Sequence, residues 1–127
     1  MKKTFRTVAA TMALALAVPA GVLASTASPA LASCTAHKMP NLDDGYDSVL
    51  GAGSTGLALR TGPHVSCGLI LRIPEGRIVG LQCYQQGDVV NQVPTWSAVN
   101  FQGNPGWVSD AYLKRGGSYD YCGDEGW

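Results

Sequence analysis

Four cysteines constrain the fold of this 127-residue chain more than any other feature of its sequence. They are Cys34, Cys67, Cys83 and Cys122, and all of them follow an apolar N-terminal segment. Thiols oxidise outside the cytosol, and an even number of cysteines in a small exported chain fits two disulfides. The sequence alone allows three pairings. A chain of this length forms one domain, so we expect one small fold that is stabilised by disulfides.

The N-terminal segment has the layout of a secretory signal. Basic residues precede an apolar run over residues 8–24, and small residues follow it. Two small-x-small sites could be cleaved, after Ala24 or after Ala32, and we favour Ala32, which makes residues 1–32 the signal peptide. No other apolar stretch approaches the length of a membrane span. We therefore expect a secreted protein, either extracellular or associated with the cell wall.

Cys34 also leaves a second localisation open. Leu31-Ala32-Ser33-Cys34 resembles a lipobox, in which the cysteine would carry a lipid and anchor the protein to the membrane. Polar residues separate these four from the apolar run, whereas a lipobox follows its apolar run directly. Lipidation would also leave an odd thiol. We therefore favour a disulfide at Cys34 and keep the lipoprotein as the minor alternative.

Loss of the signal would change the charge of the chain. The whole sequence has nine basic and nine acidic side chains. Three of the basic ones lie within residues 1–32, so the exported part has a formal charge of −3. Nucleic-acid binding needs a basic face that neutralises phosphates, and we expect no nucleic-acid partner.

The pattern of the exported part predicts an all-β fold. Residues 33–53 are polar and predict an irregular N-terminal arm. Short apolar runs between Gly and Pro turns follow within residues 54–115, and they predict a small five-stranded antiparallel barrel. The runs cover residues 57–60, 69–73, 78–84, 96–101 and 106–108. Residues 116–127 form an aromatic and acidic tail, and the polar residues 85–95 predict a protruding loop that could bind a partner.

Four motifs, in this order, are similar to those of bacterial SH3-like (SH3b) domains. They are Leu57-Ala58-Leu59-Arg60-Thr61-Gly62-Pro63, Ile73-Pro74-Glu75-Gly76, Trp96-Ser97-Ala98-Val99 and Gly106-Trp107-Val108-Ser109-Asp110-Ala111-Tyr112-Leu113. The resemblance implies an SH3-like barrel. Among small secreted actinobacterial members a cysteine ends the strand that corresponds to residues 79–83, and another lies in a C-terminal tail. The resemblance thus implies a Cys83–Cys122 disulfide, which leaves Cys34 with Cys67.

The resemblance also implies a binding function. SH3b domains commonly accompany cell-wall hydrolases and bind peptidoglycan or its peptides through aromatic residues in a groove between loops. The arm and the tail are too short to form a catalytic domain, so we expect a binding module that acts without one. The expected ligand is peptidoglycan or a peptide derived from it.

Aromatic side chains are the candidate ligand-binding residues, because they offer large amphipathic surfaces at low entropic cost. They are Tyr84, Trp96, Trp107 and Tyr112. If Val99 and Val108 face inward, strand alternation points Trp96 and Trp107 outward, where they could frame one groove. Aromatic residues in the strands of a small barrel also pack in cores, and this alternative applies to each of the four.

Other motifs are weak indications of a metal, cofactor or catalytic site. Cys34-x-x-His37 and His64-x-x-Cys67 have zinc-like spacing, but oxidation of the cysteines argues against a metal. Residues 51–56 match G-x-G-x-x-G without a βαβ unit, which favours a linker. The acidic residues Asp43, Asp44 and Asp47 lack the spacing of a calcium loop and predict solvated surface. No nucleophile motif or close carboxylate pair is evident, so we expect no enzyme activity, no cofactor and no metal.

Two further hypotheses remain open. A secreted inhibitor or scaffold could contact an extracellular enzyme through residues 85–95. A metal-binding protein could use His37 and His64 together with free thiols. In each case we expect a monomer with no membrane span.

Overall fold

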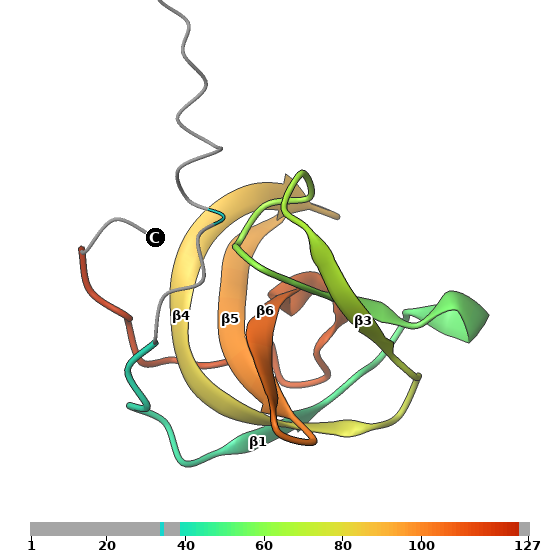
Figure 1. The fold of residues 1–127 in the computed structure, drawn as a ribbon, viewed down its shortest axis with the longest axis horizontal. Coiled ribbons are helices and arrows are strands. Elements are labelled where there is room, and N and C mark those ends of the chain that lie inside the picture. The colour runs from blue at the N-terminus through green and yellow to red at the C-terminus, as the bar shows by residue number, and fades with distance from the viewer. Residues whose placement is uncertain (1–33, 35–38, 125–127) are drawn as a thin grey trace, which may run out of the picture.

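A computed structural model describes residue 34 and residues 39–124. These residues form six strands and two short 3-10 helices, and no α-helix occurs among them. The strands form one antiparallel sheet in the order β1-β4-β5-β6-β2-β3, which curls into a half-barrel (Figure 1). The strands are β1 (Tyr46–Ser48), β2 (Leu57–Arg60), β3 (Leu69–Ile73), β4 (Ile78–Val90), β5 (Val93–Phe101) and β6 (Asn104–Ser109), and the 3-10 helices are η3 (Gly53–Thr55) and η4 (Asp110–Tyr112).

The all-β fold is confirmed, but the sheet has six strands and not the expected five. The additional strand is β1, which lies within the arm that the sequence predicts to be irregular. Its residues pair antiparallel with the start of β4, from Tyr46 opposite Gly80 to Ser48 opposite Ile78. A three-residue strand is too short to show an alternating pattern. It forms because the outer edge of β4 would otherwise leave backbone groups unpaired.

The prediction of a protruding loop over residues 85–95 is wrong. β4 continues to Val90 and β5 begins at Val93, so these residues form the end of a long hairpin. Asn91 and Gln92 make the turn with φ angles of 46° and 69°, the left-handed conformations that two-residue hairpin turns require. The strands are only partly buried here, and they therefore lack the apolar alternation that marks a strand in a sequence.

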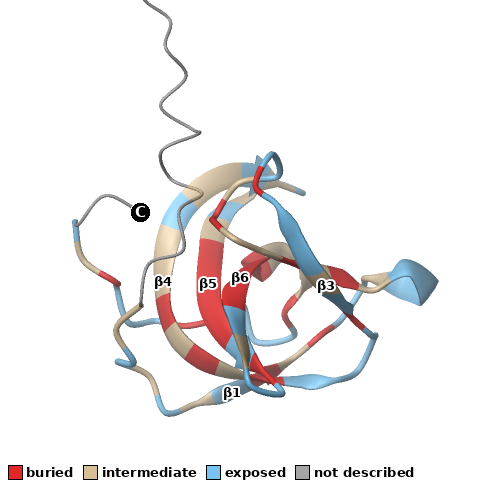
Figure 2. Ribbon diagram, viewed as in Figure 1, coloured by how far each residue is buried: buried red, intermediate tan, exposed pale blue. Residues whose placement is uncertain are grey.

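The central strands are buried on both faces, and Figure 2 shows runs of consecutive buried residues along β5 and β6. Four consecutive residues of β5 and four of β6 are buried, at 96–99 and 106–109. Val99 and Val108 belong to the main core, whereas their neighbours Ala98 and Trp107 point to the opposite face and belong to a second cluster. The main core consists of Val49, Leu57, Leu59, Ile73, Val79, Leu81, Val99, Phe101, Val108 and Leu113. The second cluster consists of Cys83, Trp96, Ala98, Trp107 and Cys122.

The C-terminal tail covers the second cluster and is covalently bonded to it. A disulfide joins Cys83 of β4 to Cys122 of the tail. Beside it, Tyr84 donates its N–H to the Asp120 carbonyl at 2.7 Å and accepts the N–H of Cys122 at 2.9 Å. The tail therefore lies along the outer edge of β4, on the side opposite β5 (Figure 1).

The second disulfide joins Cys34 to Cys67, so both pairings implied by the resemblance are confirmed. Disulfides are consistent with an extracellular protein. The sulfur of Cys34 is bonded to Cys67 and cannot also carry a lipid thioether, so the lipoprotein alternative is incompatible with this bond. In the part of the chain described above, no helix has the length and apolar character to cross a membrane. The expected signal peptide lies outside the described residues.

Buried hydrogen bonds also attach the tail to the sheet. The Ser97 hydroxyl of β5 donates to Asp110 Oδ1 at 2.6 Å and accepts the N–H of Ser118 at 2.9 Å. Asp47 of β1 accepts the N–H of Gly117 at 3.0 Å. Asp47 is 3% exposed, so the expectation that this acid lies on solvated surface is wrong. Its carboxylate is buried because backbone N–H groups satisfy it.

Two neighbouring glycines of the tail provide a matched test of this packing. Gly116 and Gly117 both have a φ of 84°, which costs an alanine about 1–2 kcal/mol. A Cβ on Gly116 meets nothing within 4 Å, whereas one on Gly117 would overlap the Asp110 carboxylate and the Ser97 hydroxyl. We expect Gly117→Ala to lower the free energy of unfolding by about 3 kcal/mol or more, and Gly116→Ala by only the backbone cost. Urea denaturation measures both, and equal losses would contradict the packing described.

The Asp110 carboxyl gives the stability a predictable pH dependence. Burial raises its pKa from 3.8 to about 6, against the lowering effect of hydrogen bonds from Ser97 and Thr95. The folded protein therefore keeps this proton to a higher pH than the unfolded chain, and Asp110 reduces the free energy of unfolding as the pH rises from about 4 to about 6.

Asp110→Asn removes this titration and keeps an oxygen that can accept from Ser97. We expect the variant to match the wild type at pH 3.5 and to be more stable at pH 7.5, by an amount on the order of 2 kcal/mol. Thermal unfolding across this pH range measures the difference. The matched control is Asp120→Asn, which changes an exposed carboxylate. A stability difference that is the same at both pH values would contradict a buried, titrating Asp110.

Candidate functional site

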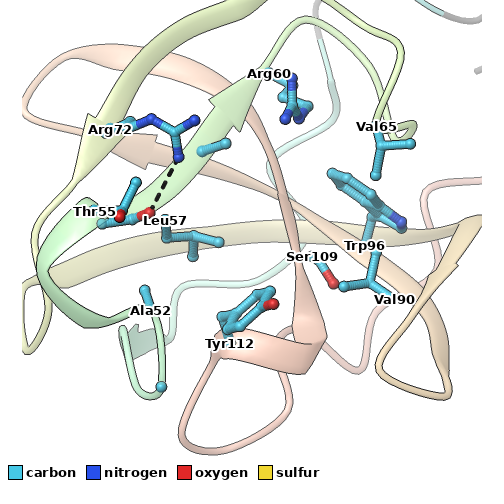
Figure 3. A pocket seen from close by; sticks show the side chains of 13 residues that line it. Ala52, Thr55, Leu57, Arg60, Val65, Arg72, Val90, Trp96, Ser109 and Tyr112 are labelled. Carbon is cyan, nitrogen blue, oxygen red and sulfur yellow. Dashed lines mark hydrogen bonds between the residues drawn. The ribbon is translucent and has the colours of Figure 1, made fainter.

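A cleft of about 330 Å³ lies between η3, β2, β3 and η4 and reaches the end of the β4–β5 hairpin. Figure 3 shows its lining side chains, with the two arginines on the upper side of the view and Tyr112 on the lower. The lining combines aromatic, aliphatic, hydroxyl and guanidinium side chains. The residues are Gly51, Ala52, Thr55, Gly56, Leu57, Ala58, Arg60, Val65, Arg72, Val90, Trp96, Ser109 and Tyr112.

Two of the four predicted ligand-binding aromatics line this cleft. Trp96 borders the cleft but is 2% exposed, so the expectation that its ring points outward to frame a groove is wrong. Its indole N–H donates to the Asp88 carbonyl at 2.8 Å. Tyr112 ends η4 and is half-buried. Its hydroxyl accepts a hydrogen bond from Asn91 Nδ2 at 3.2 Å. Both rings are thus held in place by the hairpin that the sequence predicts to be a loop.

The other two aromatics lie elsewhere. Trp107 is 2% exposed within the second cluster, so the expectation that it presents its ring to a groove is wrong. Strand alternation does point it away from the main core, but the tail covers that face. Tyr84 lies on β4 beside the tail, where its ring packs against that of Tyr121 with 5.6 Å between the ring centroids. The structure therefore brings Trp96 and Tyr112 together and separates Trp107 and Tyr84 from them.

A bulge in β4 fixes one wall of the cleft. It was not predicted from the sequence. The hairpin pairs Gln86 with Thr95 and then Val90 with Val93, so residues 87–89 of β4 lie opposite Pro94 alone. A Cβ on Gly87 would overlap the Pro63 carbonyl and press on Trp96, so this close approach requires glycine. A glycine within a strand is the sequence signal that could have indicated the bulge.

Asp88, in the same bulge, holds the loop that carries Val65. Its carboxylate accepts from His64 Nδ1 at 2.8 Å and from the Val65 N–H at 2.8 Å. The hydrogen bond from His64 lowers the pKa of Asp88 below its ordinary value, and burial opposes this only in part. An ionised carboxylate only accepts, so His64 Nδ1 is the donor of this hydrogen bond. His64 therefore has a structural partner within the described residues.

Glu75 fixes the opposite wall. Its carboxylate oxygens accept the N–H groups of Gly51 and Ala52, each at 2.8 Å. These two hydrogen bonds lower the pKa of Glu75. Residues 51–56, which the sequence analysis interprets as a linker, thereby become an ordered rim of the cleft.

Arg60 and Arg72 place two positive charges on the cleft. Arg60 Nη1 donates to the Cys67 carbonyl at 3.0 Å, and Arg72 Nη1 donates to the Gly56 carbonyl at 3.4 Å (Figure 3). The lining in contrast includes no acidic side chain of the described residues. The cleft is therefore an apolar and cationic site.

A second hollow, of about 550 Å³, lies between the arm and β4 and is larger but acidic. Its lining includes Asp43 and Asp44. The Asp43 carboxylate already accepts the N–H of Gly45 at 2.7 Å and the Ser118 hydroxyl at 2.7 Å. Because structural hydrogen bonds occupy its main polar group, we regard the smaller cleft as the candidate site.

Cys34 and Cys67 cannot serve as zinc ligands, because their sulfurs are bonded to each other in a disulfide. His37 lies outside the described residues. Across residue 34 and residues 39–124, His, Cys, Asp and Glu form no group of three or more that could hold a metal ion.

No protein-family model matches this sequence, and no curated protein matches it. The residues that line the cleft therefore indicate what it can bind. Its rings and aliphatic side chains offer apolar contact, and its guanidinium groups offer charge-assisted hydrogen bonds.

Asp88→Ala tests how the cleft wall is held. The change removes the two carboxylate oxygens that accept from His64 Nδ1 and from the Val65 N–H. We therefore expect faster amide hydrogen exchange at Val65 and a loss of about 1–2 kcal/mol in the free energy of unfolding. Asp44→Ala, which removes an exposed carboxylate, is the control. Unchanged protection of the Val65 amide in Asp88→Ala would show that the loop is held by other contacts.

Proposed function

We propose that this protein is a secreted, non-catalytic binding module of the SH3-like (SH3b) type and that its cleft binds peptidoglycan peptides of the cell wall. The observation that carries the proposal is the meeting of Trp96 and Tyr112. Both are predicted ligand-binding residues, they come from separate motifs of the sequence, and they line the same cleft. The two disulfides and the signal-like N-terminus support export to a compartment where such peptides occur.

The construction of the cleft supports binding of a short peptide. Its walls come from η3, η4 and the strands β2 to β6, whose positions are fixed by hydrogen bonds and a disulfide, so little conformational entropy is lost when a ligand enters. Half-buried Tyr112 and exposed Val65 supply apolar contact surface, and the buried ring of Trp96 supports it from behind with little area of its own. Apolar, hydroxyl and guanidinium groups suit recognition, and we assign no chemical step to them.

Retention on purified cell walls tests the proposal. Val65 lines the cleft and is 55% exposed, so Val65→Asp should leave the fold intact and place a charge in the binding surface. We expect the wild type to sediment with walls and Val65→Asp to be retained at least about tenfold less, because an aspartate would be desolvated by the ligand. Val89→Asp is the matched control, since Val89 is also exposed, at 68%, and does not line the cleft.

Thermal unfolding of both variants verifies that the fold is retained. Failure of the wild type to sediment with walls, or equal retention of all three proteins, would contradict the proposed function.

The alternative function is a protein-interaction module that contacts an extracellular enzyme through residues 85–95. One observation favours it, namely that Val89 is exposed in the bulge near the tip of the hairpin. The same two variants separate the alternatives. Co-purification with an extracellular enzyme that Val89→Asp abolishes and Val65→Asp preserves would favour the hairpin as the contact.

A further inference from the structure

Two guanidinium groups line the cleft without an acidic neighbour. Arg60 ends β2, and Arg72 on β3 pairs with Ala58, which lines the same cleft. Within the described part of the chain, neither arginine forms an ion pair with a carboxylate. Two like charges beside apolar walls create a local positive potential that an anionic group of a ligand would relieve.

Both guanidinium groups are oriented by the backbone. The Cys67 carbonyl accepts from Arg60, and the disulfide to Cys34 helps to fix this carbonyl. The Gly56 carbonyl accepts from Arg72. Each of these hydrogen bonds uses one N–H of a guanidinium, which has several more to donate. The two side chains can therefore bind a ligand group without giving up the contacts that position them.

We propose that Arg60 and Arg72 together bind the free C-terminal carboxylate of the peptide in the cleft, an inference that rests on the proposed function. A planar guanidinium matches a carboxylate and forms short, charge-assisted hydrogen bonds with it. The cleft, at about 330 Å³, is at the small end of ligand sites, which suits the end of a peptide and not a long internal segment. Tyr112 and Val65, which line the same cleft, then contact the residues that precede the carboxylate.

A phosphate polymer of the cell wall would fit this surface less well. Polyanions are bound by rows of cations that each neutralise one phosphate. The other basic side chains of residues 39–124 are Arg77, Lys114 and Arg115, and none of them lines the cleft. Acidic residues outnumber basic ones in the exported part, so a long polyanion would be repelled beyond the cleft.

Calorimetric titration of the exported chain with two synthetic peptidoglycan stem peptides tests the inference. The peptides are identical except that one ends in a free carboxylate and the other in a C-terminal amide. We expect the wild type to bind the carboxylate peptide at least about tenfold more tightly. Arg72→Gln should bind both peptides with nearly equal affinity, and because Arg72 is exposed, the variant should remain folded.

Arg115→Gln is the matched control, since it removes the same charge outside the cleft and should keep the full preference. Arg60→Gln should lose the preference as Arg72→Gln does, and Arg60→Lys, which keeps the charge but not the planar donor pair, should recover part of it.

The outcomes separate the inference from the function on which it rests. Equal binding of the two peptides by the wild type would overturn the carboxylate site and leave the peptide-binding function standing. Binding of neither peptide would overturn both. A poly(glycerol phosphate) chain that displaces the carboxylate peptide and binds more tightly than it would overturn the assignment to a peptide carboxylate.

Discussion

Burial of both faces of β5 and β6 is the constraint on which the rest of this structure depends. One face packs into the main core, and the other carries Trp96, Ala98 and Trp107, which a small sheet cannot bury by itself. The tail provides the missing cover. The Cys83–Cys122 disulfide, the backbone hydrogen bonds of Tyr84 and the buried hydroxyl of Ser97 attach it to the sheet. A domain of this size has little apolar area to spare, so covalent and polar attachment of the tail stabilises a second layer.

The candidate site is a consequence of the same arrangement. Trp96 is fixed by packing in the second cluster and by its hydrogen bond to the Asp88 carbonyl, and it borders the cleft although it is almost fully buried. Structural acids hold the walls, since Asp88 and Glu75 accept backbone N–H groups on opposite sides. Both carboxylates bind backbone N–H groups and neither lines the cleft. Among the described residues, the charged side chains that line it are therefore the two arginines.

The sequence predicted the elements whose signals are local. Short apolar runs between turn residues identified β2 and β3 with the bounds that the structure has, and the start of β4. Features that depend on distant contacts were missed. β1 pairs with residues that are thirty or more positions away, the hairpin end is a strand despite its polar composition, and Trp107 is buried because the tail returns to cover it. The roles of Asp88 and Glu75 were not predicted either, because their partners are loop amides far away in the sequence.

The central claim is that the ligand binds in the cleft that Trp96 borders, whereas Trp107, which is equally buried, does not line it. The two indole N–H groups report on the two places separately. A titration of the ¹⁵N-labelled protein that begins at residue 33 with a carboxylate-terminated stem peptide, followed by heteronuclear NMR, measures both. The account predicts that the indole signal of Trp96 and the amide of Val65 shift with increasing ligand, while the indole signal of Trp107 stays in place. Shifts confined to Trp107 or to the acidic hollow around Asp43 and Asp44 would contradict it.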